Sequence, residues 1–306
     1  MEKRVIVISG PTCSGKTSLS ILLAKHFCTE IISADSRQIY KRLSIGTAKP
    51  SGKELETVKH HFIDLLEPNE DYNVSRFESE ALEVIKILHR ENKIPVVVGG
   101  SGLYIKAIVE GLWNDVDTDP ELRAILLKEK KEKGSLYIYD KLKKIDPKSA
   151  ATMLPQNWKR VIRALEVFNS TGKSIIDFHQ EYKRKTDIEF FQFGLNWKRE
   201  ELYINIEKRV DKMIATGLVA EVKSILESGY PPELNSLNTV GYKEIIAYLN
   251  GQYSLERAIE LIKRNTRRFA KRQITWFGKD TKIKWFDVTG KDDLLKIADL
   301  IITKFN

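Results

Sequence analysis

The sequence predicts an α/β protein in which helices flank a parallel sheet that carries a phosphate-binding loop (P-loop), with a mostly helical insertion in the middle of the chain. Short runs of β-branched residues alternate with helical segments as far as Trp113. A glycine-rich turn joins the first of these runs to the first helical segment. The alternation stops between residues 114 and 187, where the pattern is helical.

The first part of the chain supplies most strands of the expected sheet. Its first apolar run, after Arg4, has β-branched residues without alternating polar ones, which is typical of a strand buried on both faces. The segment after the glycine-rich turn repeats leucines at helical spacing. By these criteria, strands are expected over residues 4–9, 30–33 and 94–98, and helices over 15–27, 75–91 and 102–110.

The rest of the chain divides the molecule into two domains. Pro120 follows an acidic linker and suits the first turn of a helix. Strand character returns over residues 188–195, and the remainder is mostly helical, with a short strand near Trp285 and a final helix. We therefore expect an α/β core made of residues 1–113 and 188–306 and a helical insertion domain made of residues 114–187.

The longest helix is expected over residues 254–277, and it combines an apolar stripe with a basic face. The stripe consists of Leu255, Ala258, Ile259, Ile262, Phe269 and Phe277. Largely opposite lie Arg257, Lys263, Arg264, Arg267, Arg268, Lys271, Arg272 and Lys279, against one acidic residue, Glu260. Because the chain has a net charge of +9, we expect a polyanionic partner on this face. The lysines of residues 128–133 alternate with glutamates, which favours a solvated surface there.

Composition indicates a cytoplasmic protein without a membrane segment. With 42% hydrophobic residues over 306 positions, the chain can bury a sizeable core. Its two cysteines, Cys13 and Cys28, provide neither a disulfide framework nor a zinc ligand set, which favours a reducing compartment. No apolar run approaches the about 20 residues of a membrane helix, and the run after Arg4 is too short for a secretory signal.

Residues 10–17 form the phosphate-binding motif. They match G-x-x-x-x-G-K-[ST] between an expected strand and an expected helix, which is the context that the motif requires. Glycines let the backbone N–H groups turn inward, and the helix adds the positive end of its dipole. Lys16 supplies a charge to a phosphate oxygen, and the Thr17 hydroxyl can hold Mg²⁺. The expected diphosphate-binding residues are Gly10, Pro11, Thr12, Cys13, Ser14, Gly15, Lys16 and Thr17.

The motif reports a bound di- or triphosphate and leaves the reaction open. Most P-loops belong to nucleoside triphosphatases and kinases, so a P-loop small-molecule kinase or NTPase is the main alternative. One absence weighs against it, because the expected strand 94–98 ends in Gly99-Gly100-Ser101, where an NTPase usually has a metal-holding Asp. A kinase would turn over nucleoside triphosphates and would be indifferent to RNA.

An acidic residue follows the second expected strand. The carboxyl ends of parallel strands meet at one edge of a sheet, so Asp35 would face the same crevice as the P-loop. There it is suited to act as a general base or to hold an amine. A turn-capping role for the same side chain stays open.

Beyond the P-loop, several segments carry a recognisable pattern. They are residues Asp35–Tyr40, Ile45–Pro50, His60–Asp64, Val98–Tyr104, Arg160–Val167, Val240–Tyr242 and Lys271–Trp276. In sequence and order, and over nearly the whole chain, they resemble the tRNA dimethylallyltransferase (tRNA isopentenyltransferase) family. The resemblance implies transfer of the dimethylallyl group from dimethylallyl diphosphate to N6 of the adenosine at tRNA position 37, next to the anticodon, with release of diphosphate.

The resemblance also implies roles for individual residues. Asp35 would take a proton from the adenine amine, Ser101 stands where the family usually has Thr, and Lys16 and Arg209 would act on the diphosphate. Mg²⁺ is the implied cofactor, with Thr17 as its ligand, and a monomer is expected. Residues expected to contact the tRNA anticodon stem-loop are Asp35, Ser36, Arg37, Gln38, Ser101, Arg123, Lys159, Arg160, Arg163, Gly241, Tyr242, Lys243, Lys271, Arg272 and Gln273.

Some features depart from the family pattern or stay open. Lys159 replaces a usual Gln, and Asn205 and Asn238 replace frequent Arg residues, which puts the contacts at Lys159 and Asn238 in doubt. Four aromatic residues are candidates either to line the substrate channel or to fill the core: Tyr40, Phe62, Tyr104 and Trp276. His60 and His61 are adjacent and would point in opposite directions in an extended segment, which disfavours a shared metal. Two further alternatives are disfavoured. An enzyme acting on free adenine nucleotides would have little use for the insertion, and a non-catalytic RNA-binding protein would have little use for an intact P-loop.

Overall fold

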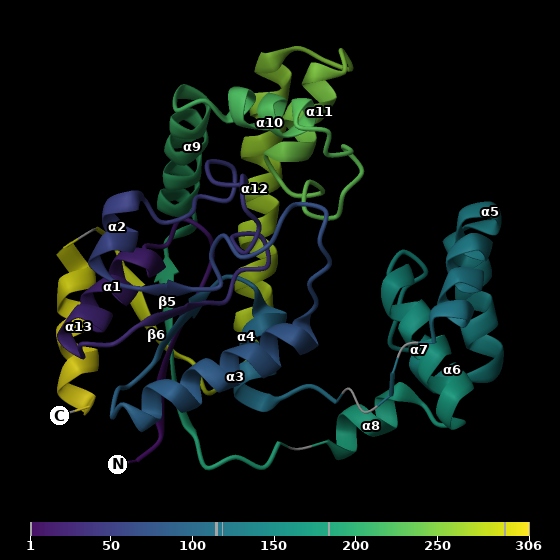
Figure 1. The fold of residues 1–306 in the computed structure, drawn as a ribbon, viewed down its shortest axis with the longest axis horizontal. Coiled ribbons are helices and arrows are strands. Elements are labelled where there is room, and N and C mark those ends of the chain that lie inside the picture. Colours follow the sequence, from purple (N-terminus) through teal and green to yellow (C-terminus); the bar gives the residue numbers. More distant parts are fainter. Residues whose placement is uncertain (1, 114–115, 118, 183, 291, 306) are drawn as a thin grey trace. The chain divides into compact units, whose positions relative to one another are not determined.

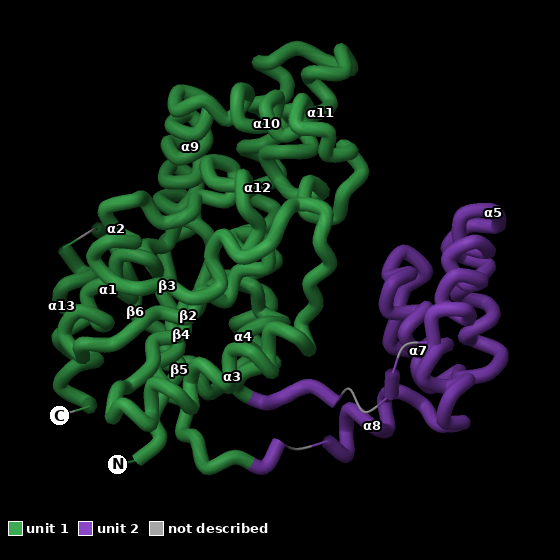
Figure 2. Tube along the Cα trace, in the orientation of Figure 1, with its two compact units in different colours: residues 1–109, 186–306 green, residues 110–185 purple. Residues whose placement is uncertain are grey.

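The structure, a computed structural model, describes residues 2–113, 116–117, 119–182, 184–290 and 292–305. It divides into two compact units, one formed by residues 1–109 and 186–306 and the other by residues 110–185 (Figure 2). The sequence analysis placed these boundaries after residues 113 and 187.

The first unit is built on a parallel sheet of six strands in the order β3-β2-β4-β1-β5-β6, which confirms the predicted α/β class (Figure 1). Ser9 of β1 pairs with Gly99 of β4, and Ser33 of β2 pairs with Val98 of β4. The carboxyl ends of these three strands therefore lie at one edge of the sheet. The strands are β1 (Arg4–Ser9), β2 (Ile31–Ser33), β3 (His60–His61), β4 (Val96–Gly99), β5 (Glu189–Trp197) and β6 (Lys284–Val288).

Helices cover both faces of this sheet because alternate residues of each buried strand point to opposite sides. On one side, Ile6 and Ile8 of β1 pack with helices α1 (Lys16–His26) and α13 (Asp292–Phe305). On the other side, Val5 and Val7 belong to a larger core to which six other helices contribute. Those helices are α3 (Val74–Arg90), α4 (Gly102–Glu110), α9 (Arg199–Ala215), α10 (Leu218–Glu227), α11 (Tyr242–Leu249) and α12 (Leu255–Phe277).

The second unit is helical, as predicted, and has a core of its own. Asp119 accepts hydrogen bonds from the backbone N–H groups of Glu121 and Leu122, which caps a helix that starts at Pro120. The apolar residues that this unit buries include Leu126, Ile138, Leu142, Val161, Ile162 and Leu165. Its helices are α5 (Pro120–Ile145), α6 (Pro147–Ala150), α7 (Trp158–Thr171) and α8 (Ile175–Glu181).

The expectation that the longest helix lies near residues 254–277 is confirmed, because α12 runs unbroken for 23 residues, whereas α5 consists of two helices that meet at the non-helical Gly134. Two other expectations about single elements were wrong. In α12, Phe269 is 39% exposed and the buried stripe runs through Ala270 and Gln273 instead. The sequence analysis also missed α2 (Gly52–Thr57) and the two-residue strand β3, which are too short to show a periodic pattern.

Among the described residues, no helix has both the length and the apolar character needed to cross a bilayer.

Candidate active site

A cavity of about 670 Å³ lies at the carboxyl edge of the sheet in the first unit. Strand β1 lies between β4 and β5, and the order of the strands along the chain reverses at this point of the sheet. Ligands bind at such a reversal in sheets of this kind, so the loop after β1 lies where a ligand is expected. Residues 12–17 of the P-loop line this cavity together with Asp35, Ser101 and Arg209, whereas Gly10 and Pro11 do not. The structure thus brings together the four residues for which the sequence predicted a chemical role.

The P-loop is curled by residues with left-handed backbone angles. Gly15 has φ +92° at the start of α1, and Cys13 adopts φ +64°. Lys16 folds back over the loop and donates a hydrogen bond from Nζ to the carbonyl of Pro11 at 2.6 Å. Burial, followed by the nearby charge of Arg209, lowers the pKa of Lys16 to about 8. The loop therefore presents a cation whose charged form a bound anion would stabilise.

Arg209 comes from α9 and lies against the P-loop. Its guanidinium donates to the Thr12 hydroxyl at 2.8 Å and lies 3.6 Å from the Cys13 sulfur. A planar guanidinium in this place can bind phosphate oxygens in addition to its protein partners. The expected pairing of Arg209 with the diphosphate site is consistent with this geometry.

Asp35 is held through one of its two carboxylate oxygens. Its Oδ1 accepts hydrogen bonds from the backbone N–H of Arg37 at 2.8 Å and of Gln38 at 3.4 Å. Its other oxygen has no hydrogen-bond partner among the described residues. The two roles left open by the sequence are therefore compatible, because the side chain stabilises the turn and keeps one oxygen for a substrate.

Ser101 lies beside the Asp35 turn. Its hydroxyl oxygen accepts a hydrogen bond from the backbone N–H of Ser36 at 3.1 Å. Because β2 and β4 are neighbours, the residues that follow them meet at the same edge of the sheet. Ser101 and Asp35 thus form one polar wall of the cavity.

Gln273 joins two parts of the site that are far apart in sequence. Its Oε1 accepts the backbone N–H of Thr12 at 2.8 Å, and its Nε2 donates to the carbonyl of Gly100 at 2.9 Å. The sequence analysis assigned Gln273 to tRNA contact. Both polar groups of its side chain are instead used inside the protein.

Glu221 is a residue that the sequence analysis missed. Its carboxylate accepts backbone N–H groups from Ser44, Ile45 and Gly46 at 2.8 to 3.2 Å. It also accepts the Tyr242 hydroxyl at 2.6 Å. Glu221 therefore fixes the loop that supplies Gly46 and its neighbours to the cavity wall. A glutamate on α10 gives no local sequence signal for partners so far along the chain.

Two further expected tRNA contacts are engaged inside the protein. Tyr242 is 0% exposed, so its side chain cannot reach an RNA. A Cβ on Gly46 would lie 2.3 Å from its ring, which explains the glycine there. Gln38 uses its amide to donate to the carbonyls of Thr47 and Ala48 and to accept from Ser33. Both side chains support the cavity wall.

Other expected contacts remain available at the mouth of the cavity. Gly241, Lys243 and Arg272 line it, and Lys271 is exposed on the same helix as Arg272. Ser36 and Arg37 also line it, although the Arg37 guanidinium donates to the carbonyl of Asn235 at 2.7 Å.

The basic face of α12 is smaller than the sequence indicated. Lys263 pairs with Asp211 at 2.6 Å, and Arg267 pairs with Glu207 at 2.8 Å. Both acids come from α9, so counting charges along α12 alone overstated the free cations. The exposed cations that remain near the cavity end are Arg264, Arg268, Lys271 and Arg272, here called the α12 basic face.

In the second unit, the expected contacts fall into two groups. Lys159 and Arg160 are exposed at the start of α7. Arg123 and Arg163 instead contact the buried carboxylate of Glu166, at 3.1 and 3.6 Å, and Arg163 also donates to the carbonyl of Val116. Burial raises the pKa of Glu166, and the two arginines act in the opposite direction. Much of what Arg163 contributes is therefore structural.

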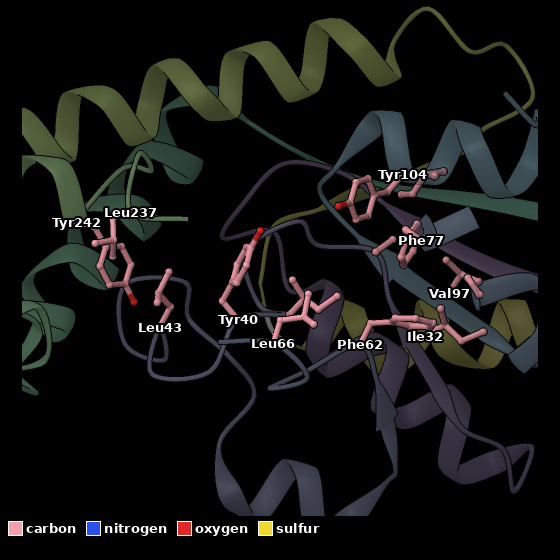
Figure 3. Close-up of a cluster of buried hydrophobic side chains, with 14 of the residues drawn as sticks. Ile32, Tyr40, Leu43, Phe62, Leu66, Phe77, Val97, Tyr104, Leu237 and Tyr242 are labelled. Atoms are coloured by element: carbon pink, nitrogen blue, oxygen red, sulfur yellow. The ribbon is translucent and has the colours of Figure 1, made fainter. Parts of the chain in front are cut away.

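The aromatic candidates divide between the cavity and the core. Tyr104 and Trp276 line the cavity. Tyr40 and Phe62 are buried, and Figure 3 shows Phe77 between Phe62 and Tyr104, with its ring centroid 5.2 Å from that of Phe62 and 4.3 Å from that of Tyr104. Core packing, the blander of the two expectations, holds for Tyr40 and Phe62.

The adjacent histidines have separate protein partners. His61 Nε2 lies 2.6 Å from Glu30, and His60 Nδ1 lies 2.8 Å from the carbonyl of Val58. Over the described residues there is no group of three His, Cys, Asp or Glu side chains that could hold a metal.

Comparisons with known proteins agree on one family. A family model described as IPP transferase matches residues 38–280. A tRNA dimethylallyltransferase of Alkaliphilus oremlandii is 45% identical over 100% of this chain and 98% of its own length. One of Carboxydothermus hydrogenoformans is 47% identical over 99% of this chain and 98% of its own.

Solved structures give the same result. A tRNA isopentenylpyrophosphate transferase from Bacillus halodurans has a TM-score of 0.73 at 38% identity, covering 99% of this chain and 96% of its own. A eukaryotic dimethylallyltransferase acting on tRNA has a TM-score of 0.80 at 33% identity, covering 93% of this chain and 73% of its own. With a family model matching more than half of its length and relatives 45% and 47% identical along nearly all of it, the chain belongs to the IPP transferase family.

Proposed function

We propose that this protein is a tRNA dimethylallyltransferase, which transfers the dimethylallyl group of dimethylallyl diphosphate to N6 of adenosine 37 in the tRNA anticodon loop. The observation that carries the proposal is that one cavity is lined both by a P-loop and by Asp35 and Ser101. Its full-length relatives bear this name, and one structural neighbour acts on tRNA. The alternative of a small-molecule kinase is disfavoured because the relatives are transferases of another kind. It is also disfavoured because β4 ends in Gly99, where NTPases usually have an acidic residue.

The first requirement of the reaction is a stabilised leaving group. As the bond between the allylic carbon and oxygen breaks, negative charge builds up on the diphosphate. Lys16, Arg209 and the inward N–H groups of the P-loop supply fixed positive charge and donors for it. Because these groups are held by protein contacts before substrate arrives, little reorganisation is needed.

The second requirement is an acceptor for the amine proton. The N6 lone pair forms the new bond to carbon, the electrons of the breaking bond leave with the diphosphate, and the N6 proton passes to Asp35. The oxygen of Asp35 without a partner among the described residues suits this role. Ser101, beside Asp35, can hydrogen-bond the amine or the leaving oxygen. The adenine must leave its stack to reach this wall, which costs least in a single-stranded loop.

A magnesium ion fits this site in a limited way. Mg²⁺ usually keeps several waters and takes one or two protein ligands together with phosphate oxygens. The Thr17 hydroxyl lies in the cavity wall and can be one such ligand, whereas no group of three His, Cys, Asp or Glu side chains that could hold a metal occurs among the described positions. When bound through the diphosphate, the ion would neutralise charge on the leaving group.

The exposed cations suit an RNA partner. In the first unit Arg272 of the α12 basic face lines the cavity, and in the second unit Lys159 and Arg160 are exposed at the start of α7. Phosphate contacts of this kind position an RNA without reading its sequence. We expect the anticodon stem-loop to be the part bound, and the enzyme to act as a cytoplasmic monomer.

The test is to incubate the protein with unmodified tRNA and dimethylallyl diphosphate labelled in the allyl group, and then to digest the RNA to nucleosides. We expect label on adenosine 37 and none on a matched tRNA with guanosine at that position. Labelled ATP in a parallel reaction tests the kinase alternative. Release of phosphate from ATP, with no label in tRNA, would refute the proposed function.

A further inference from the structure

We propose that Gln273 is a positioning residue that clasps the P-loop to the Gly99–Ser101 turn and so sets the spacing between the diphosphate site and the proton acceptor. Its effect on catalysis rests on the proposed function, whereas its effect on diphosphate binding does not. The side chain is 6% exposed and lies at the cavity wall.

The carboxamide of Gln273 supplies both an acceptor and a donor, and the two contacts need one of each. The Thr12 N–H needs an acceptor, at 2.8 Å, and the Gly100 carbonyl needs a donor, at 2.9 Å. A carboxylate has no proton to donate, an ammonium has no lone pair to accept with, and an aliphatic side chain has neither. Asparagine is one methylene shorter. The two hydrogen bonds therefore depend on the chemistry of glutamine and not only on its size.

The turn opposite Gln273 is shaped to receive it. A Cβ on Gly100 would lie 2.3 Å from Gln273 Nε2, so a larger residue there would push the amide away. One turn of α12 later, a Cβ on Gly102 would lie 2.2 Å from the Trp276 ring. Two glycines thus admit two side chains of α12 at close range. The contact of Trp276 with Gly102 does not involve these hydrogen bonds and places α12 against the same turn.

The clasp acts on Thr12 of the P-loop, which Arg209 also contacts. Thr12 is held at its backbone N–H by Gln273 and at its hydroxyl by Arg209, at 2.8 Å in each case. On the other side, Ser101 directly follows the clasped Gly100. One side chain therefore links the loop that would hold the leaving group to the residue beside the general base. Misplacement of reacting groups by about 1 Å can cost about 100-fold in rate.

The test compares variants of Gln273 with matched variants of Gln252, which is exposed outside the catalytic cavity. Q273L removes both hydrogen bonds, Q273E keeps the acceptor for Thr12 but loses the donor, and Q252L and Q252E make the same changes elsewhere. Binding of inorganic diphosphate is measured by calorimetry without RNA. Rates are measured with labelled dimethylallyl diphosphate and tRNA, and the folded fraction by circular dichroism.

We expect Q273L to weaken diphosphate binding by about tenfold and to lower kcat by about 100-fold, while the KM for tRNA changes by less than about threefold. Q273E should lower kcat as well, and the Gln252 variants should match the wild type. Because the clasp has two ends, G100A should reproduce the defect, and the double variant G100A/Q273L should be no worse than the poorer single variant.

Three outcomes would overturn the clasp: diphosphate binding as tight in Q273L as in wild type, tighter binding, or independent effects of G100A and Q273L. Tighter binding would mean that Gln273 competes with phosphate for the Thr12 N–H. If Q273L does not fold, Q273E and G100A carry the same comparison. If wild-type protein binds diphosphate but does not label tRNA, the proposed function fails while the comparison of diphosphate affinities still tests the clasp.

Discussion

Lys16 is the residue whose ionisation is most directly tied to substrate. Burial lowers its pKa to about 8 in the ligand-free protein, and a bound diphosphate favours its charged form and raises that pKa again. Below pH 8 the ammonium is already charged, and the diphosphate benefits from it in full. Above pH 8, the Lys16 side chain is mostly neutral and must take up a proton when the diphosphate binds. The Kd for dimethylallyl diphosphate is therefore expected to rise above about pH 8, by at most tenfold per pH unit.

Calorimetry between pH 8 and pH 9.5 checks this, because the last ionisation of the diphosphate ester is complete over that range. In Lys16→Arg the cation stays charged, so the rise should disappear even if binding is weaker. Cys13→Ala removes the other titratable side chain of the P-loop and should keep the rise. A wild-type Kd that is flat across the range would show that Lys16 does not carry the dependence.

Asp35 combines a structural and a chemical task, and substitution can separate them. Asparagine keeps the oxygen that accepts the N–H groups of Arg37 and Gln38, but it cannot take a proton from the amine. We expect D35N to lose about 100- to 10,000-fold in single-turnover rate while its Tm stays close to that of the wild type. D35A should lose both activity and part of the stability of the turn.

The measurement pairs the transfer rate at saturating substrates with a thermal unfolding scan. The role of Asp35 as the base would be refuted if D35N transferred the allyl group within about threefold of the wild-type rate. A D35N variant with a Tm as low as that of D35A would instead show that the amide does not preserve the turn.

At the scale of elements, α10 supports the cavity through Glu221. One carboxylate accepts three backbone N–H groups and the Tyr242 hydroxyl, so every partner is a donor. In E221Q one oxygen becomes an NH₂ group that faces those donors. We expect a loss of about 2 kcal/mol in the free energy of unfolding, measured by urea titration.

The matched control for this prediction is E227Q, on the same helix. Glu227 is exposed and its nearest cation, Lys223, is 3.6 Å away, so its replacement should change stability by less than about 0.5 kcal/mol. Equal losses in the two variants would mean that the loop does not depend on Glu221.

The elements differ in how far the sequence could predict them. The strands β1 and β4 were predictable because they are buried on both faces and show it as unbroken β-branched runs. The helix α12 was predictable from its period, but the exposure of Phe269 was not, because that side chain lies at the cavity instead of in the core. Short elements such as β3 depend on their neighbours in space and leave no pattern.

The site divides in the same way. The P-loop and Asp35 could be predicted because each is a local motif beside a strand, whose end fixes where it must lie. Glu221 and Gln273 could not be placed, because their partners are distant in sequence and contact them only after the sheet has formed. For the same reason Tyr242 was taken for an RNA contact, although it is a buried support.

At the scale of the whole molecule, each of the two units has its own core and exposes its own cations. If both bind the same tRNA, removing cations from either unit should weaken RNA binding and reduce its dependence on salt. Each lost phosphate contact lowers the slope of log K against log salt by about 1. This prediction concerns charge alone and needs no knowledge of how the units are arranged.

The variants are K159A/R160A in the second unit and R268A/K271A in the first, with K25A/K296A on α1 and α13 as the control for lost charge. We expect each of the first two pairs to reduce the salt slope by about 2 and to leave diphosphate binding unchanged, whereas the control pair should alter neither. Fluorescence titrations of tRNA at several salt concentrations give the slopes. Because non-specific attraction by the net charge of +9 would respond equally to any pair, equal slopes for all three would exclude a defined RNA surface on these helices. A change confined to the α12 pair would assign tRNA binding to the first unit alone.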